Sequence, residues 1–243
     1  MLCLRFQAPF AVFRTFTAGS FRPTAPFMTP SAAYGLLLNL AGIEMRDDDG
    51  TSEMTLIRSG LPSAMIALGA LEIPGQHSVY QQLHNYRVGG NDKIDDPLNP
   101  GEKITVKEEG LRRTKGSKYN ITPARRSFLS NLRGYLCLKG NDELAAQVLD
   151  GLAGNRPRKY GLPFLGDNNF LPDRIEAVER IEPAHWFVEV EPDDDGGIAA
   201  NIARLTVTID RADMSKTQSR LFRSTDDVLA DIPDSAWIKI AYG

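Results

Sequence analysis

The stretch from Pro23 to Glu44 limits the fold of this chain more than any other segment, because it encodes a short helix with both ends marked. Thr29 can accept a backbone N–H as the N-cap, Pro30 suits the first turn, and Gly42 suits the left-handed conformation that ends many helices. Apolar residues between these ends recur at steps of three and four: Ala33, Leu36, Leu37, Leu40 and Ala41. This spacing predicts a helix with one face packed on a core.

The amino end of this helix is a candidate anion site. Its free N–H groups and the positive end of the helix dipole favour a negative group there. Arg22, Thr29 and Ser31 lie on the approach, and no Asp or Glu precedes Glu44. Two interpretations stay open on these features: a bound phosphate, or an ordinary capped helix in the core.

Charge is distributed unevenly along the 243 residues. The formal net charge of −3 argues against a protein that coats nucleic acid non-specifically. From Lys103 to Arg126, however, eight basic residues stand against two acidic ones, which gives this segment a charge of +6. The acidic runs 47–49 and 193–195 each precede a glycine, and we interpret them as solvated turns rather than metal sites.

Cysteine content and hydropathy indicate the compartment. Cys3 and Cys137 are the two cysteines, and each lies inside an apolar run typical of a strand. We therefore predict two reduced core residues in a cytoplasmic protein. No run approaches the roughly 20 apolar residues of a membrane span, and no phosphate loop or dinucleotide-binding glycine pattern is present. We expect no metal, no cofactor and no membrane contact.

The order of predicted elements indicates the fold class. Residues 2–7 alternate as in a half-buried strand, and two short strands are expected near 54–57 and 65–68. The nearly continuous apolar run in 132–139 predicts a central strand covered on both faces. A helix capped by Asn141 and ended by Gly154 should follow, with one apolar face made of Leu144, Ala145, Val148, Leu149 and Leu152.

A further strand over 174–178 completes a β-α-β-β-α-β order, which predicts a ferredoxin-like α+β domain. The strand-like runs 186–190, 203–209 and 237–242 then predict an antiparallel region that forms a second small sheet or extends the first.

The segment 76–126 interrupts this domain. Apolar residues become sparse there and glycines and prolines frequent, over a length that exceeds a plain loop. Ile104 and Val106 alternate with basic and polar residues, which predicts an inserted arm containing an exposed hairpin with its basic side chains outward.

A second basic segment follows the second helix. Arg156, Arg158 and Lys159 supply charge, and Tyr160 and Phe164 supply rings on which a base could stack. An RNA contact and a plain helix-to-strand connection with solvated basic residues are equally compatible with this composition.

Four segments together resemble the CRISPR-associated Cas-five family of the RAMP superfamily, whose members hold the five-prime end of the guide RNA in Cascade-type surveillance complexes. The segments occur in the family's order: Leu2-Cys-Leu-Arg-Phe-Gln-Ala-Pro-Phe, Thr29-Pro-Ser-Ala-Ala-Tyr-Gly-Leu-Leu-Leu-Asn-Leu-Ala-Gly-Ile43, Tyr135-Leu-Cys-Leu after Arg125-Arg126, and Tyr160-Gly-Leu-Pro-Phe-Leu-Gly166. The helix segment is the most specific, and the region beyond about residue 181 adds little.

The resemblance implies a ferredoxin-like (RRM-like) RAMP domain over 1–180, a long inserted β-hairpin thumb over about 88–123, and a β-rich extension over 181–243. It further implies RNA contacts at the start of the first helix, in the segment from His77 to Arg87, in the thumb and in the Gly161 to Gly166 loop. The candidate RNA-binding residues are Arg22, Ser31, His77, Gln82, His84, Tyr86, Arg87, Lys107, Arg112, Arg113, Lys115, Lys118, Tyr119, Arg125, Arg126, Arg156, Arg158, Lys159 and Gly166.

By the same resemblance we expect a non-catalytic subunit of a type I Cascade-like complex. Such a subunit caps the five-prime handle of the crRNA and links the backbone subunits to the large subunit for RNA-guided DNA targeting. The expected partners are the crRNA, a Cas-seven-type backbone subunit, a Cas-eight-type large subunit and nearby target DNA.

Catalysis is the main alternative. One branch of the family cleaves precursor crRNA without metal, using a tyrosine, a lysine and a histidine near the thumb. This chain has three histidines, His77, His84 and His185, and no adjacent Lys-His pair, so that arrangement is not reproduced. We expect His185 to be structural. A metal-independent endoribonuclease and a ferredoxin-like protein-interaction module without RNA are the two competing interpretations.

Overall fold

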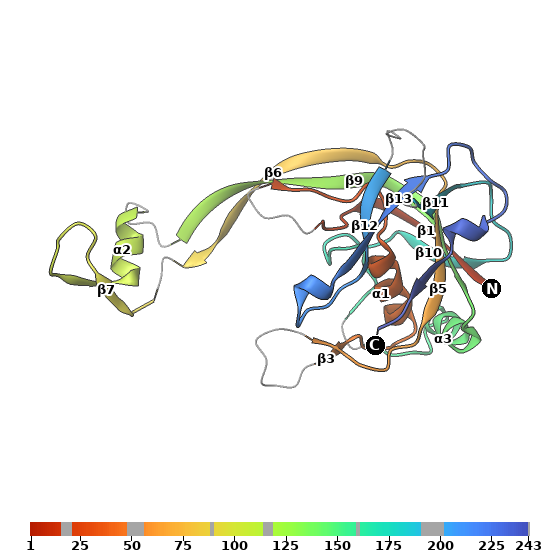
Figure 1. Ribbon diagram of the computed structural model, residues 1–243, viewed down its shortest axis with the longest axis horizontal. Coiled ribbons are helices and arrows are strands. Elements are labelled where there is room, and N and C mark those ends of the chain that lie inside the picture. The colour runs from red at the N-terminus through yellow and green to blue at the C-terminus, as the bar shows by residue number, and fades with distance from the viewer. Residues whose placement is uncertain are drawn as a thin grey trace. The chain divides into compact units, whose positions relative to one another are not determined.

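The computed structural model describes residues 1–15, 21–47, 56–87, 90–113, 119–158, 161–190 and 202–242, with the side chains of 82–87 and 119–123 left aside. These residues form a mixed α/β protein with a ten-stranded, largely antiparallel sheet, two two-stranded sheets and three α-helices (Figure 1). Contacts divide the chain into two compact units. Unit 1 comprises 1–16, 23–77 and 127–243, and unit 2 comprises 17–22 and 78–126.

The main sheet begins with four adjacent antiparallel strands. Their order is β10 (Arg174–Val178), β1 (Leu2–Ala11), β9 (Tyr119–Lys139) and β5 (Ala64–Ala70). The strands predicted over 2–7, 65–68 and 174–178 are therefore confirmed, and the one predicted over 132–139 is the last part of a longer strand.

Strand β9 is central and covered on both faces, as its apolar run predicts. Leu136 and Leu138 belong to the larger core cluster that includes the helices. Tyr135 and Cys137, which point the other way, belong to a second cluster around Trp186. Alternate side chains of one strand thus serve two cores, which explains why this stretch has no polar face.

Helix α1 (Pro30–Leu40) has the predicted ends. The Thr29 side chain accepts the N–H of Ala32, Ala41 is the C-cap, and Gly42 has a φ of +70°. The predicted apolar face is buried, and so are Tyr34 and Leu38 on other sides of the helix. Most sides of the helix are buried because α1 packs against β5, α3, β12 and β14, and a strip of Ala32, Gly35 and Asn39 stays half-buried.

Helix α3 (Asp142–Leu152) is capped by Asn141, whose side chain accepts the N–H of Leu144, and it is followed by Gly154 at a φ of +84°. The prediction was wrong in one position, because Leu149 is 45% exposed and Gly151 occupies the buried face instead. A Cβ on Gly151 would overlap the backbone carbonyl of Leu40. The glycine therefore lets α3 approach α1 closely.

The C-terminal strands extend the sheet. β11 (His185–Glu189) pairs with β5 and with β13 (Gln218–Ser224), β13 pairs with β12 (Ile202–Thr208), and β14 (Ile238–Ile240) pairs with β5. β11 and β12 are each shifted by one residue from the predicted runs 186–190 and 203–209, β14 lies within the run 237–242, and β13 was not predicted. Two 3-10 turns, η1 (Met214–Lys216) and η2 (Asp234–Ala236), complete the region.

The two cysteines lie in strands and are buried, as predicted, but they are not reduced. Cys3 and Cys137 face each other across β1 and β9 and are joined in a disulfide. The sequence places each cysteine in a strand but does not give the register that makes them direct partners.

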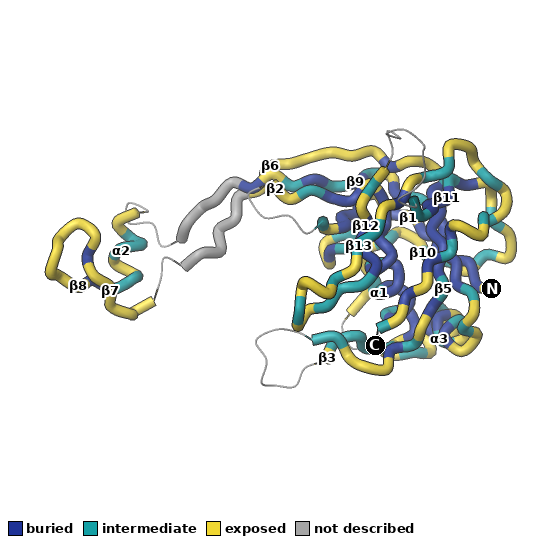
Figure 2. Tube along the Cα trace, viewed as in Figure 1, coloured by how far each residue is buried: buried dark blue, intermediate teal, exposed yellow. Residues whose placement is uncertain are grey.

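Unit 2 contains β2 (Phe21–Arg22), most of β6 (Gly75–Arg87), β7 (Lys93–Asp95), β8 (Lys103–Thr105) and helix α2 (Val106–Arg113). β7 and β8 form a small antiparallel sheet with Ile104 buried, so the predicted hairpin is short, and the chain turns into a helix at Val106. β6 pairs with β9 and is exposed along residues 75–81 (Figure 2).

A last small sheet in unit 1 pairs β3 (Arg46–Asp47) with β4 (Leu56–Ile57). In the part of the chain that the structure describes, no helix has the length and apolar character needed to cross a membrane.

Candidate functional site

The buried carboxylate of Asp96 connects the loop after β7 to helix α2 in unit 2. The side chain of Asp96 is fully buried and accepts two hydrogen bonds from Nη1 of Arg112, at 2.8 and 2.9 Å. It also accepts the backbone N–H of Leu98 and the side-chain amide of Asn99. The Leu98 N–H and then the Arg112 and Asn99 bonds hold the pKa of Asp96 below its ordinary value. Arg112, a predicted RNA ligand, thus joins α2 to the loop after β7.

Other basic side chains of unit 2 are more open. Lys103 and Lys107 are exposed on β8 and at the start of α2. Arg113 is 76% exposed and pairs with Glu109 one helical turn earlier, at 2.6 Å. Because an exposed ion pair of this kind contributes little, a phosphate can compete for the guanidinium.

A second basic group of unit 2 lies where β2 runs parallel to β9. The pairing sets Phe21 beside Arg125 and Arg22 beside Arg126. The Arg125 guanidinium lies 5.3 Å from the centre of the Phe21 ring and donates to the Ser78 hydroxyl. Exposed arginines next to an exposed ring suit a single RNA strand, whose phosphates and bases need both.

The start of α1 is covered by protein. Ser31 is only 9% exposed and its hydroxyl hydrogen-bonds to that of Thr29, which caps the helix. The neighbouring Phe27 and Met28 are fully buried. This burial supports the interpretation of an ordinary capped helix in the core over that of a phosphate site.

Arg156 and Arg158 serve the ends of the helices. Arg156 donates to the carbonyl of Ala41 at 3.0 Å and to the Asp150 carboxylate at 3.2 Å. Arg158 donates to the carbonyl of Gly151 at 2.8 Å. Both carbonyls lie at the C-terminal ends of the helices, where the negative end of the helix dipole favours a cation, so two predicted RNA ligands act as cationic caps of α1 and α3.

The loop 161–170 lies against β1. The N–H of Val12 donates to the carbonyl of Leu165 at 3.2 Å, and Leu165 is buried. Gly166 has a φ of +79°, and a Cβ there would overlap the carbonyl oxygen of Val12. Gly166, also predicted to contact RNA, therefore has a structural reason to be glycine.

His77 is exposed in unit 1, and its Nε2 lies 2.8 Å from the Ser130 hydroxyl. Its ring stacks on Phe128, with the ring centres 5.5 Å apart, and Phe128 meets Phe10 edge-on at 5.5 Å. Neither phenylalanine was predicted from the sequence as a site residue. One sequence signal could have indicated an irregular strand here: Leu129 and Leu132 are three residues apart, whereas residues on one face of a strand are two or four apart.

His185 belongs to the framework. Its Nδ1 lies 2.9 Å from the carbonyl oxygen of Thr225, next to the buried Trp186, which agrees with a structural role.

Several predicted site residues lie outside the described part of the chain. These are Lys115, Lys118 and Lys159, together with the side chains of Gln82, His84, Tyr86, Arg87 and Tyr119.

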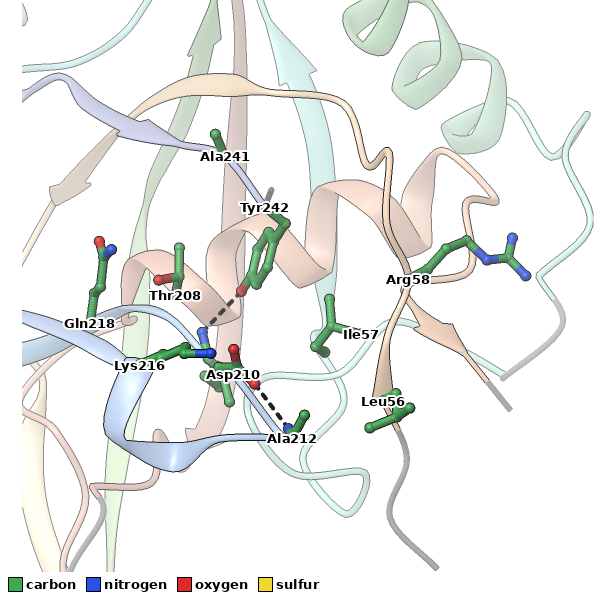
Figure 3. A pocket seen from close by; sticks show the side chains of 11 residues that line it. Leu56, Ile57, Arg58, Thr208, Asp210, Ala212, Lys216, Gln218, Ala241 and Tyr242 are labelled. Carbon is green, nitrogen blue, oxygen red and sulfur yellow. Dashed lines mark hydrogen bonds between the residues drawn. The ribbon is translucent and has the colours of Figure 1, made fainter. Parts of the chain in front are cut away.

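A cavity of about 350 Å³ opens in unit 1 between β4, the turn after β12 and Tyr242 (Figure 3). Two of its polar groups have partners within the protein: Asp210 accepts the N–H of Ala212, and the Tyr242 hydroxyl accepts that of Ile209. Burial raises the pKa of Tyr242, so its hydroxyl stays neutral.

The fold and its surface define a mixed α/β protein in which a large antiparallel sheet carries an inserted and partly basic unit. A family model described as "CRISPR-associated protein (Cas_Cas5)" matches residues 1–223. The chain therefore belongs to this CRISPR-associated family, and the resemblance stated from the four segments is confirmed.

One solved structure shares the fold, and a second gives a lower score. A chain described as "CRISPR RNA-guided surveillance complex" superposes with a TM-score of 0.53 at 16% identity, covering 93% of this chain and 89% of that chain. A chain described as "Crystal structure of Cas protein" gives 0.46 at 15% identity, over 94% and 95%. No curated protein sequence matches the chain.

Proposed function

We propose that this protein is a non-catalytic subunit of a type I Cascade-like complex that binds and caps the five-prime handle of the crRNA. The observation that carries the proposal is the family match over residues 1–223. The fold shared with a chain of an RNA-guided surveillance complex supports it.

The strand order supports a ferredoxin-like domain with an inserted thumb. Along the chain, β1, α1, β5, β9, α3 and β10 follow the order β-α-β-β-α-β. In the sheet these four strands lie in the order β10-β1-β9-β5, so the first and third strands of the unit, β1 and β9, are central and the other two flank them. The insertion between β5 and the core part of β9 contains residues 78–126 of unit 2, and we assign this insertion as the thumb.

We assign the RNA contact of unit 2 to its exposed cations. Lys103, Lys107, Arg113 and Arg125 are exposed, whereas Arg112 is engaged with the buried Asp96. Arginine and lysine hold phosphates without reading sequence, which suits a subunit that retains an RNA end. Lys115 and Lys118 belong to the same basic segment.

Salt-dependent RNA binding tests this proposal. The purified protein, or its complex, is titrated with a labelled single-stranded RNA of the repeat's five-prime handle at several salt concentrations. The triple variant Lys107→Ala/Arg113→Ala/Arg125→Ala should bind more weakly, with a slope of log affinity against log salt reduced by about 2, since each phosphate contact contributes about 0.7.

A matched control removes the same kind of charge elsewhere. Arg174 and Lys216 are exposed cations of unit 1, with side chains 67% and 70% exposed. Arg174→Ala/Lys216→Ala should leave the affinity and the slope nearly unchanged. Equal losses in both variants, or no RNA binding at all by the unmodified chain, would contradict the proposal and favour a protein-interaction module.

The absence of catalysis needs its own test. Incubation of the purified protein with repeat RNA in EDTA should leave the RNA intact. Discrete cleavage within the repeat, abolished by His77→Ala or His84→Ala, would instead identify a metal-independent endoribonuclease.

We further propose that the protein links a Cas-seven-type backbone subunit to a Cas-eight-type large subunit next to the target DNA. Co-purification of a tagged chain with both subunits and one short RNA is the expected result. Recovery of the chain alone from cells that express all components would contradict it.

A further inference from the structure

Three rings from three strands gather on the surface of unit 1. Phe10 comes from β1, Phe128 from β9 and His77 from β6, and we call this group the aromatic platform. His77 and Phe128 are nearly parallel, at 29°, whereas Phe10 meets Phe128 at 79°. Phe10 is 46% exposed, Phe128 is half-buried and His77 is exposed. His77 and Phe10 are therefore the more accessible members of the group, and Phe128 lies in contact with both.

A backbone irregularity turns the platform outward. Asn131 is the non-glycine residue of the described chain with a positive φ, at +54°. Leu129 and Leu132, on either side of it, are both fully buried although they lie three residues apart. A regular strand would put them on opposite faces, so the irregularity resets the alternation and leaves Phe128 and Ser130 on the outer face.

Polar groups border the rings. The Ser130 hydroxyl lies 2.8 Å from His77 Nε2, and Ser130 is the cross-strand partner of Phe10. A Cβ on Gly75 would come within 3.0 Å of both polar atoms, so glycine leaves room for this hydrogen bond. On the same strand Arg133, whose side chain is 40% exposed, adds a positive group beside Glu72.

We propose that the aromatic platform stacks an unpaired base of the bound RNA strand. The assignment rests on the proposed function and adds a base-binding site to it. A base has a flat apolar face and a polar edge, and the platform offers accessible rings with the Ser130 hydroxyl and the His77 ring nitrogen beside them. Exposed rings on a sheet surface are a common means of holding single-stranded RNA.

A fluorescent base tests the stacking directly. The probe is a single-stranded RNA of the repeat's five-prime handle with 2-aminopurine placed at one position at a time, because stacking quenches its emission. The unmodified protein should quench one or two positions strongly. Phe10→Leu/Phe128→Leu should abolish this quenching and weaken binding about 5- to 100-fold, as expected for one lost base stack.

Two further variants separate stacking from folding. Leu149→Ala removes an apolar side chain of similar exposure, 45%, from α3 and should leave affinity and quenching within about twofold of the unmodified protein. Phe128→Trp keeps a ring and should retain the quenching. The circular dichroism spectrum and Tm of each variant verify the fold.

The outcomes distinguish the two proposals. If the unmodified protein binds the RNA and Phe10→Leu/Phe128→Leu keeps both the affinity and the quenching, the platform is not a base site and the handle-binding proposal is unaffected. If the unmodified protein does not bind the RNA, the proposed function is overturned and this assignment with it.

Discussion

Replacing Gly166 by alanine tests whether the loop 161–170 is held on β1 by a close backbone contact. A left-handed conformation costs a non-glycine residue about 1–2 kcal/mol. The added Cβ would also overlap the Val12 carbonyl, so the loop must withdraw. Withdrawal loses the Val12–Leu165 hydrogen bond, about 0.5–1.5 kcal/mol, and exposes part of the buried Leu165 side chain, which is worth about 1.5–3 kcal/mol when fully buried. We expect a total loss of about 3–5 kcal/mol.

Urea denaturation followed by tryptophan fluorescence measures this loss, and the same loop offers a matched control. Gly161 has a φ of +88°, and a Cβ added there would meet no atom of another segment within 4 Å, so Gly161→Ala should cost only about 1–2 kcal/mol. Equal unfolding midpoints for the two variants would refute the close-contact argument. A Gly166→Ala protein of unchanged stability but weaker RNA binding would show that this glycine acts through the ligand instead.

Three further predictions concern the helix contact and the organisation of unit 2. Gly151→Ala should lower the free energy of unfolding by about 2–4 kcal/mol, measured by urea denaturation, because its Cβ would overlap the Leu40 carbonyl; an unchanged midpoint would contradict this packing. Arg112→Ala should increase deuterium exchange in 90–113 at least about tenfold, because the buried Asp96 carboxylate loses its charged partner and keeps only the Leu98 N–H and the Asn99 amide. Arg113→Ala removes an exposed ion pair and should change the exchange less than about twofold, so similar exchange in both variants would refute the distinction. The pKa of Asp96 is lowered, so its contribution to the stability of unit 2 is complete above the ordinary pKa of about 4 and is lost as the pH falls through the lowered pKa. The protection of 90–113 from exchange, relative to an unstructured peptide at the same pH, should therefore fall on acidification below about pH 4, and constant protection would contradict this.

Local signals predicted the framework well. A helix cap depends on one or two side chains and a few neighbouring residues, so the sequence alone predicts it. The ends of α1 and α3 were predicted in this way from Thr29, Gly42, Asn141 and Gly154. β13 and β6 were harder. β13 is short and only partly buried, and β6 is polar and exposed on both faces in residues 75–81, so neither shows the alternation of a half-buried strand.

The candidate site was less predictable, because residue type does not reveal the partner. Arg112 and Arg158 have the composition of RNA ligands, yet one binds a buried carboxylate and the other caps a helix. The platform was missed for the opposite reason. Phe10 and Phe128 are ordinary core residues by type, and the outward position of Phe128 depends on the left-handed Asn131 between two buried leucines.

The burial of most of α1 has a consequence for how the chain matures. This helix is made before β12 and β14, yet it packs against both, and the ring of Tyr34 stacks on that of Tyr242. Until residues 238–242 have left the ribosome, this apolar helix lacks part of its cover. We therefore expect unit 1 to reach its native state only once these residues can dock, and nascent chains that stop short of them to depend on chaperones.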